Sequence, residues 1–100
     1  MIRHIVLYRL TAAAHAEGLD SIMEKLRASA ARMAANVPGL LTCEVGPNLY
    51  GDSPHDLFYY CEFEKAEDIE AYLVHPLHEA HKDMAASWVE NGEIARLESR

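Results

Sequence analysis

Basic residues and long apolar runs are both scarce in this sequence. Lysine and arginine together number 9 against 16 aspartates and glutamates, which gives a formal net charge of −7. Nucleic acids and anionic membrane surfaces are bound through basic patches, so this balance argues against both as partners. The opening segment, MIRHIVLYRL, is too short and too charged for a signal peptide or a membrane span, and no later run stays apolar for long enough. We therefore expect a cytoplasmic protein.

Cysteine is also scarce, because the 100 residues include only Cys43 and Cys61. Two cysteines form no disulfide framework, and their separation is not a metal-ligand spacing. Buried free thiols of a cytoplasmic protein are the favoured interpretation, and a disulfide between them is the less favoured alternative. Half of the residues are hydrophobic and a quarter are charged. We expect one domain, residues 1–100, with a modest core that oligomerisation would supplement.

The first predicted element is a β-strand over Ile2–Leu10, because apolar residues alternate there and several are β-branched. Farther on, apolar residues recur at spacings of three and four from Leu19 to Val37. This spacing predicts an amphipathic helix that Pro38 and Gly39 end. In the strand, one face carries Ile2, His4, Val6, Tyr8 and Leu10, and the other carries Arg3, Ile5, Leu7 and Arg9.

The second half of the chain predicts further strands and a broken helix. Acidic residues around Asp68 suit the first turn of a helix that runs to about Val74. Pro76 suits the first position of a new helix, which the Asn91-Gly92 pair would close. Strands are predicted at Leu40–Val45, Leu57–Phe63 and Glu93–Leu97.

The predicted order is strand, helix, strand, strand, broken helix, strand. This is the βαββαβ order of the α+β ferredoxin-like fold, in which helices cover one face of a four-stranded antiparallel sheet. The other face still carries apolar residues, for example Ile5 and Leu7. Because an uncovered apolar face is an interaction surface, we expect a homodimer that packs two sheets together as a dimeric α+β barrel.

Residues 71–82, AYLVHPLHEAHK, concentrate the candidate chemistry. His75, His78 and His81 follow one another at three-residue spacing, and Tyr72 precedes them in the same rhythm. A metal site is not expected, because Pro76 separates His75 from the helix that carries the other two. Two interpretations remain open. The segment is either a structural helix break, or the bend brings a tyrosine and a histidine together as an acid/base pair.

Three stretches resemble the stress-responsive A/B barrel (Dabb) family: RHIVLYRL, PGLLTCEVGPNL and FEKAEDIEAYLVHPLHEAH. The most specific part is the run Tyr72-x-x-His75-Pro76-x-His78, supported by His4. The resemblance implies a homodimeric barrel with a cleft between sheet and helices in each subunit. Family members include stress-induced proteins and plant polyketide cyclases that need no cofactor. In those cyclases, the positions that match Tyr72 and His78 are the acid/base pair.

The candidate site follows from this resemblance and from the chemistry of the side chains. Tyr72, His78 and His4 are the candidate catalytic residues, and the expected ligand is a small organic molecule, with no cofactor and no metal. The chain departs from some of these cyclases at Leu57, where they carry a histidine, and in its alanine-rich RASAARMAA helix segment. The pocket should therefore have a different shape. Expected substrate contacts are Val6, Tyr8, Leu26, Tyr59, His75, His81 and Trp88.

The sequence leaves three functions open. The first is a cofactor-independent cyclase, isomerase or lyase that acts on a carbonyl compound. The second is a non-catalytic stress or interaction protein whose histidines only pack. The third is a cofactor-free quinol-type monooxygenase, because such enzymes share this fold class.

Overall fold

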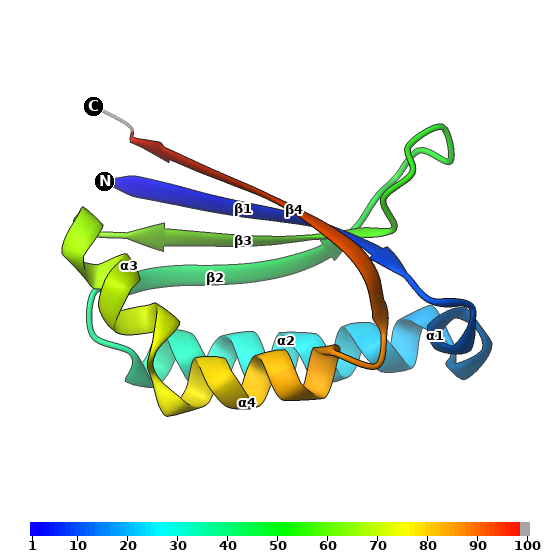
Figure 1. Ribbon diagram of the computed structural model, residues 1–100, viewed down its shortest axis with the longest axis horizontal. Coiled ribbons are helices and arrows are strands. Elements are labelled where there is room, and N and C mark those ends of the chain that lie inside the picture. The colour runs from blue at the N-terminus through cyan, green and yellow to red at the C-terminus, as the bar shows by residue number, and fades with distance from the viewer. Residues whose placement is uncertain (99–100) are drawn as a thin grey trace.

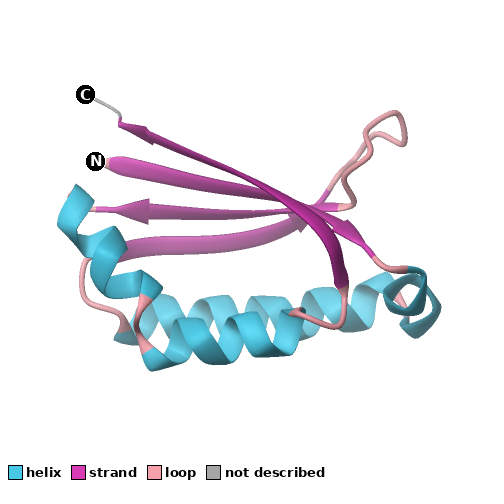
Figure 2. Ribbon diagram, viewed as in Figure 1, coloured by secondary structure: helices cyan, strands magenta, loops and turns pink. Residues whose placement is uncertain are grey.

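The computed structural model describes residues 1–98, which form a four-stranded antiparallel sheet with helices on one face (Figure 1, Figure 2). Residues 99 and 100, which the predicted domain includes, lie outside the described residues. The sheet order is β2-β3-β1-β4. This arrangement confirms the predicted α+β ferredoxin-like fold. The strands are β1 (Ile2–Leu10), β2 (Leu40–Pro47), β3 (Leu57–Phe63) and β4 (Val89–Glu98), and the helices are α1 (Ala12–Glu17), α2 (Leu19–Asn36), α3 (Ala66–Leu73) and α4 (Pro76–Ala85).

The core lies between the sheet and the helices. Alternate residues of β1 and β3 point into it, and β3 buries every second side chain from Leu57 to Phe63. The apolar stripe of α2 covers this layer, as its spacing predicts. The buried residues of α2 are Ile22, Met23, Leu26, Ala30 and Met33.

The opposite, open face of the sheet has no helix over it (Figure 1). In β1 it carries Ile5, which is half-buried, and Leu7, whose exposed fraction is 37%. Directly opposed residues share a face, so the registers with β3 and β4 place their partners beside them. The partners of Ile5 are Tyr60 of β3 and Ala95 of β4, and those of Leu7 are Phe58 of β3 and Glu93 of β4. The predicted apolar face is therefore present and uncovered within residues 1–98.

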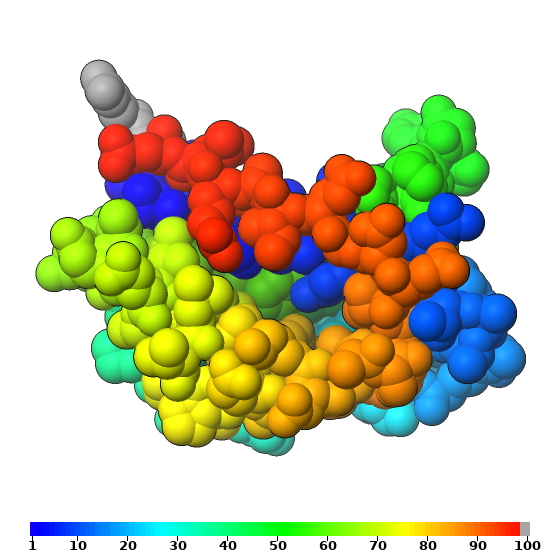
Figure 3. Space-filling model, in the orientation of Figure 1, coloured from blue at the N-terminus to red at the C-terminus, as the bar shows by residue number. Residues whose placement is uncertain are grey.

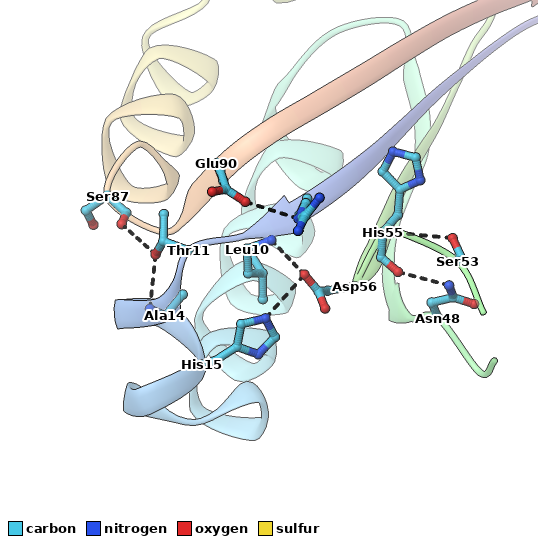
Figure 4. Close-up of polar contacts among 11 residues, drawn as sticks. Leu10, Thr11, Ala14, His15, Asn48, Ser53, His55, Asp56, Ser87 and Glu90 are labelled. Atoms are coloured by element: carbon cyan, nitrogen blue, oxygen red, sulfur yellow. Dashed lines mark hydrogen bonds and ion pairs between the residues drawn. The ribbon is translucent and has the colours of Figure 1, made fainter. Parts of the chain in front are cut away.

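A short helix, α1, was not predicted. Thr11 caps it, because its hydroxyl oxygen accepts a hydrogen bond from the Ala14 amide at 3.1 Å (Figure 4). Asp56 secures the strand that leads into it, since its carboxylate accepts from the Leu10 amide at 2.7 Å and lies 3.4 Å from His15. Thr11, a residue that commonly caps helices, is followed by three alanines, and this pattern was the signal that could have predicted α1.

The predicted boundary between α4 and β4 is wrong. Helix α4 ends at Ala85 rather than near Asn91, and β4 begins at Val89. Strand pairing explains the difference, because β4 runs beside β1 along its whole length and the Thr11 amide donates to the Trp88 carbonyl at 2.8 Å. These tertiary hydrogen bonds outweigh the local helical pattern. The Asn91-Gly92 pair therefore lies inside a strand. No helix within residues 1–98 is long and apolar enough to cross a membrane.

Candidate functional site

A cavity of about 250 Å³ opens between β4 and the α3–α4 pair. Figure 3 shows the hollow between the red and orange β4 and the yellow α4, with atoms of β1 and β3 at its floor. Its wall is mostly apolar, with a few convergent polar groups, as is usual for small-molecule sites. The residues that line it are His4, Val6, Tyr8, Tyr59, Tyr72, Leu73, His78, His81, Lys82, Gly92, Ile94 and Arg96.

Tyr72 enters the cavity from α3 and is almost fully buried, with an exposed fraction of 1%. Its hydroxyl lies 2.8 Å from the Tyr59 hydroxyl, and its ring centroid lies 4.2 Å from that of His78. Burial is the largest cause that raises the pKa of Tyr72. The phenol therefore stays protonated near neutral pH and acts as a hydrogen-bond donor rather than as a base.

The chain bend between α3 and α4 sets the position of His78. His75 is the extended N-cap of α4 and Pro76 is its first residue, which turns the chain so that His78 comes back toward Leu73. Nδ1 of His78 lies 3.2 Å from the Leu73 carbonyl oxygen. A carbonyl only accepts hydrogen bonds, so Nδ1 carries the proton and Nε2 of the neutral ring carries the lone pair. Burial lowers the pKa of His78, which favours this neutral form.

His4 has the opposite tautomer. Arg96, its partner in the β1–β4 register, donates from Nε to Nδ1 of His4 at 3.2 Å. An arginine only donates, so Nδ1 of His4 carries the lone pair and Nε2 carries the proton. Burial, and then the charge of Arg96, lower the pKa of His4 to about 4. His4 is therefore a neutral hydrogen-bond donor near neutral pH and not a second base.

His81 is the third imidazole of the cavity. Its Nδ1 lies 2.7 Å from the Ser29 hydroxyl of α2, whereas its buried Nε2 has no hydrogen-bond partner among residues 1–98. Burial is the main cause that lowers the pKa of His81 to about 4. A buried polar atom without a partner costs about 1–3 kcal/mol.

Three of the predicted contact residues lie outside the cavity, and each has a structural reason. Leu26 belongs to the apolar stripe of α2 and is packed in the core. His75 caps α4, because its Nδ1 accepts from the Leu77 amide at 3.1 Å. Trp88 is half-buried beyond α4, with the Lys25 ammonium 5.5 Å from the centre of its ring. The other predicted site residues line the cavity: His4, Val6, Tyr8, Tyr59, Tyr72, His78 and His81.

Most of the lining residues that sequence reasoning missed belong to β4. Gly92, Ile94 and Arg96 alternate toward the cavity, and this alternation was the signal that could have found them. The misplaced helix end at Asn91-Gly92 concealed Gly92, whereas Ile94 and Arg96 lie within the predicted strand Glu93–Leu97.

The cavity therefore offers one base and two donors in apolar surroundings. Nε2 of His78 can take a proton, while the Tyr72 hydroxyl and Nε2–H of His4 can donate hydrogen bonds to an oxygen that becomes negative. Arg96 and Lys82 add positive charge at its margin. Within residues 1–98, no three histidine, cysteine, aspartate or glutamate side chains gather as metal ligands do.

Solved structures with this fold cover nearly the whole chain. A dimeric ferredoxin-like protein of unknown function from Bacteroides fragilis is 24% identical, with 98% of this chain and 95% of that chain covered and a TM-score of 0.86. A Dabb family protein from Mesorhizobium loti is 21% identical, with 99% and 96% covered and a TM-score of 0.77. An antibiotic biosynthesis monooxygenase candidate from Nitrosomonas europaea is 16% identical, with 99% and 98% covered and a TM-score of 0.72. At these identities, the likeness shows the fold alone.

Sequence comparison assigns the family. No curated protein sequence shows significant similarity to the chain. The profile of the stress responsive A/B barrel domain matches residues 2–94, which is most of the chain. The resemblance carried by the three sequence stretches is thereby confirmed, and the protein belongs to the stress responsive A/B barrel domain (Dabb) family.

Proposed function

We propose that this protein is a cofactor-independent enzyme that removes a proton next to a carbonyl group, as a cyclase, isomerase or lyase does. The observation that supports this most is the pair of opposite tautomers in one cavity. Both rings line the cavity, and their Nδ1 hydrogen bonds leave His78 with an unprotonated Nε2 and His4 with a protonated Nε2. The base, His78, and the hydrogen-bond donor, His4, are thus preorganised before a ligand binds.

The proposed reaction uses each group once. Nε2 of His78 takes the proton from the carbon next to the carbonyl, and the electron pair of that C–H bond moves to form an enolate. The Tyr72 hydroxyl and Nε2–H of His4 donate hydrogen bonds to the enolate oxygen. The new imidazolium keeps its Nδ1–H bond to the Leu73 carbonyl. The proton then returns from His78 to the substrate carbon or to a leaving group.

The test is the exchange of α-hydrogens for deuterium in heavy water, followed by NMR for cyclohexanone, acetophenone and acetylacetone. The protein should accelerate exchange of at least one of these ketones beyond an equal concentration of free imidazole. General-base catalysis contributes about a hundredfold or more, so a His78→Gln variant should lose that factor. The matched control is His15→Gln, which changes an exposed histidine that lies against Asp56 outside the cavity. No acceleration of any of the three ketones would contradict the proposal.

We further propose that the protein is a homodimer formed through the open face. The supporting observations are the uncovered apolar residues of this face and the neighbour from Bacteroides fragilis, which is described as dimeric. Packing the two open faces together would complete the barrel and leave the cavity of each subunit, which lies on the other side of its sheet, available to a ligand.

A non-catalytic dimer is the second candidate, and one contact favours it. The bond from His78 Nδ1 to the Leu73 carbonyl joins α3 to α4, so His78 has a structural role whether or not it accepts protons. In that case, His78→Gln should lower the midpoint of thermal unfolding, and the wild-type protein should exchange no ketone hydrogens. Oxygen uptake with a quinol would instead indicate the monooxygenase chemistry of the third alternative.

A further inference from the structure

The two cysteines of the chain lie face to face on neighbouring strands. Cys43 of β2 and Cys61 of β3 are direct partners in the antiparallel register, and their Sγ atoms are 3.3 Å apart. Opposed residues in such a pair have Cα atoms about 4.5 or 5.5 Å apart. Both separations fall in the range that a disulfide bridges, about 4.4–6.8 Å. A bond between the two sulfur atoms therefore requires side-chain rotation rather than movement of the strands.

The two thiols differ in their surroundings. Cys43 is half-buried, and its hydrogen bonds with Cys61 and Tyr59 lower the pKa of its thiol even though burial opposes this. Cys61 is fully buried, and its hydrogen bond with Cys43 together with burial raises its pKa. Reactive thiols are accessible and easily ionised, whereas a buried protonated thiol is inert until a partner presents itself. Cys43 thus has the properties of an attacking thiol and Cys61 those of a resolving thiol.

We propose that Cys43 and Cys61 form a reversible dithiol–disulfide site that small hydroperoxides oxidise. The Cys43 thiolate attacks one oxygen of hydrogen peroxide, the O–O bond breaks, and Cys43 becomes a sulfenic acid as hydroxide leaves. The Cys61 sulfur then attacks Cys43 Sγ, the S–S bond forms, and the S–O bond breaks. The hydroxide that leaves takes the Cys61 proton as water. In total, two thiols and one hydrogen peroxide give one disulfide and two waters, and a low-molecular-weight thiol reverses the change.

This site is connected to the cavity by hydrogen bonds. The Cys43 thiol donates to the Tyr59 oxygen at 2.9 Å, and the Tyr59 hydroxyl lies 2.8 Å from that of Tyr72. When Cys43 supplies the proton that Tyr59 accepts, the proton of Tyr59 can point to Tyr72 or to Sδ of Met33, 3.9 Å away, and in the first case the Tyr72 proton remains available to a ligand. A disulfide has no S–H, so oxidation lets Tyr72 donate to Tyr59 instead. This consequence, a loss of the Tyr72 donor, rests on the proposed function.

In the direct test, the reduced protein is treated with a small molar excess of hydrogen peroxide. It is then unfolded in the presence of N-ethylmaleimide, which alkylates the remaining thiols, and its intact mass is measured. The wild-type chain should lose two hydrogens and both alkylation sites, and dithiothreitol should restore them. Cys61→Ser should stop at a sulfenic acid that dimedone labels. Cys43→Ser should keep Cys61 open to alkylation at the same peroxide concentration. Thermal unfolding of both variants checks that each is folded.

Several outcomes would overturn the site. One is that both cysteines stay open to alkylation while methionine sulfoxide appears, since the sulfoxide proves that peroxide acted. Another is a disulfide between two chains rather than within one, seen on a non-reducing gel. A third is dimedone labelling of Cys61 in the Cys43→Ser variant to the extent seen for Cys43.

The connection to the cavity has its own readout. If the reduced protein exchanges ketone hydrogens, the oxidised protein should do so at least about tenfold more slowly, because removal of one donor to a developing oxyanion commonly costs more than this. Dithiothreitol should restore the rate. An unchanged rate after complete disulfide formation would overturn the connection but not the site. A reduced protein without exchange would contradict the proposed function, while the mass measurement still decides the disulfide.

Discussion

The helix-covered face of the sheet and its open face are built from the same strands but differ in how they treat polar groups. Toward the helices, β1 and β3 present His4, Tyr59 and Cys61, each tied into hydrogen bonds with a residue from another element or strand. Toward the open side, the same strands present Ile5 and Leu7 beside exposed charged residues such as Arg3. Polar groups inside a small core lower its stability unless they form hydrogen bonds or bind a ligand. An apolar surface is unfavourable in water unless a partner covers it. The contrast supports the two proposals, namely ligand chemistry on the covered face and association through the open face.

The largest expected effect concerns the open face. In an Ile5→Glu/Leu7→Glu variant, two carboxylates replace side chains whose burial is worth about 1.5–3 kcal/mol each. The dimer dissociation constant should therefore rise by about a hundredfold or more, as analytical ultracentrifugation can measure. Leu49→Glu is the matched control, because Leu49 is 85% exposed in a loop. A double variant that dimerises as tightly as the wild type would show that the dimer uses another surface.

The next largest effect is a loss of stability at acid pH, which we expect from buried histidines on the helix-covered face. The pKa of His4 and that of His81 are lowered to about 4, so below pH 6.5 the unfolded chain binds protons that the folded chain does not. The free energy of unfolding should therefore fall from about pH 6.5 to about pH 4 and then level off for these groups, by about 2–3 kcal/mol for each histidine. Urea unfolding as a function of pH measures this dependence. The His81→Asn variant should lose the contribution of His81 to the slope of unfolding free energy against pH. An identical slope in that variant would contradict the burial assigned to His81.

A smaller effect is expected for the hydroxyl that joins the cysteines to the cavity. Tyr59→Phe removes the oxygen that lies between Cys43 and Tyr72 and keeps the buried ring. Loss of these contacts should cost about 1–2 kcal/mol of unfolding free energy, measured by urea titration. Tyr50→Phe is the control, because Tyr50 is 74% exposed. Equal stability of both variants would mean that the buried hydroxyl contributes nothing.

The smallest effect is expected at Ser29 of α2, the hydrogen-bond partner of His81. Ser29→Ala leaves Nδ1 of His81 without its hydroxyl partner, so both nitrogens of a buried ring lack hydrogen bonds. The expected loss is about 1 kcal/mol, and Ser21→Ala, on the same helix, serves as the control. If both serine variants lose equal amounts of stability, the Ser29–His81 contact is not a stabilising one.

The sequence predicted the features that depend on local periodicity. The alternation in β1 placed His4 and Val6 on one face and Ile5 and Leu7 on the other, and the stripe of α2 ended within one residue of its predicted end. Pro76 likewise separated His75 from His78, as its restricted backbone requires. These predictions succeed because each one follows from neighbouring residues.

The features that sequence reasoning missed depend on contacts between distant residues. The tautomer of His4 is set by Arg96, and the environment of His81 by Ser29, which lie 92 and 52 residues away. The Cys43–Cys61 contact requires the exact register of β2 and β3, which includes a shift between Leu40 and Thr42. Periodicity states which face a residue occupies, but not which partner it meets there. The early start of β4 has the same cause, since pairing with β1 determines it.

The central claim, that His78 and His4 face one cavity with opposite tautomers, is tested most directly by ¹⁵N NMR of the imidazole nitrogens near neutral pH. We expect His78 to be neutral with its proton on Nδ1, and His4 to be neutral with its proton on Nε2. The same tautomer in both rings, or a doubly protonated His78, would contradict it, because the cavity would then lack either the base or the donor.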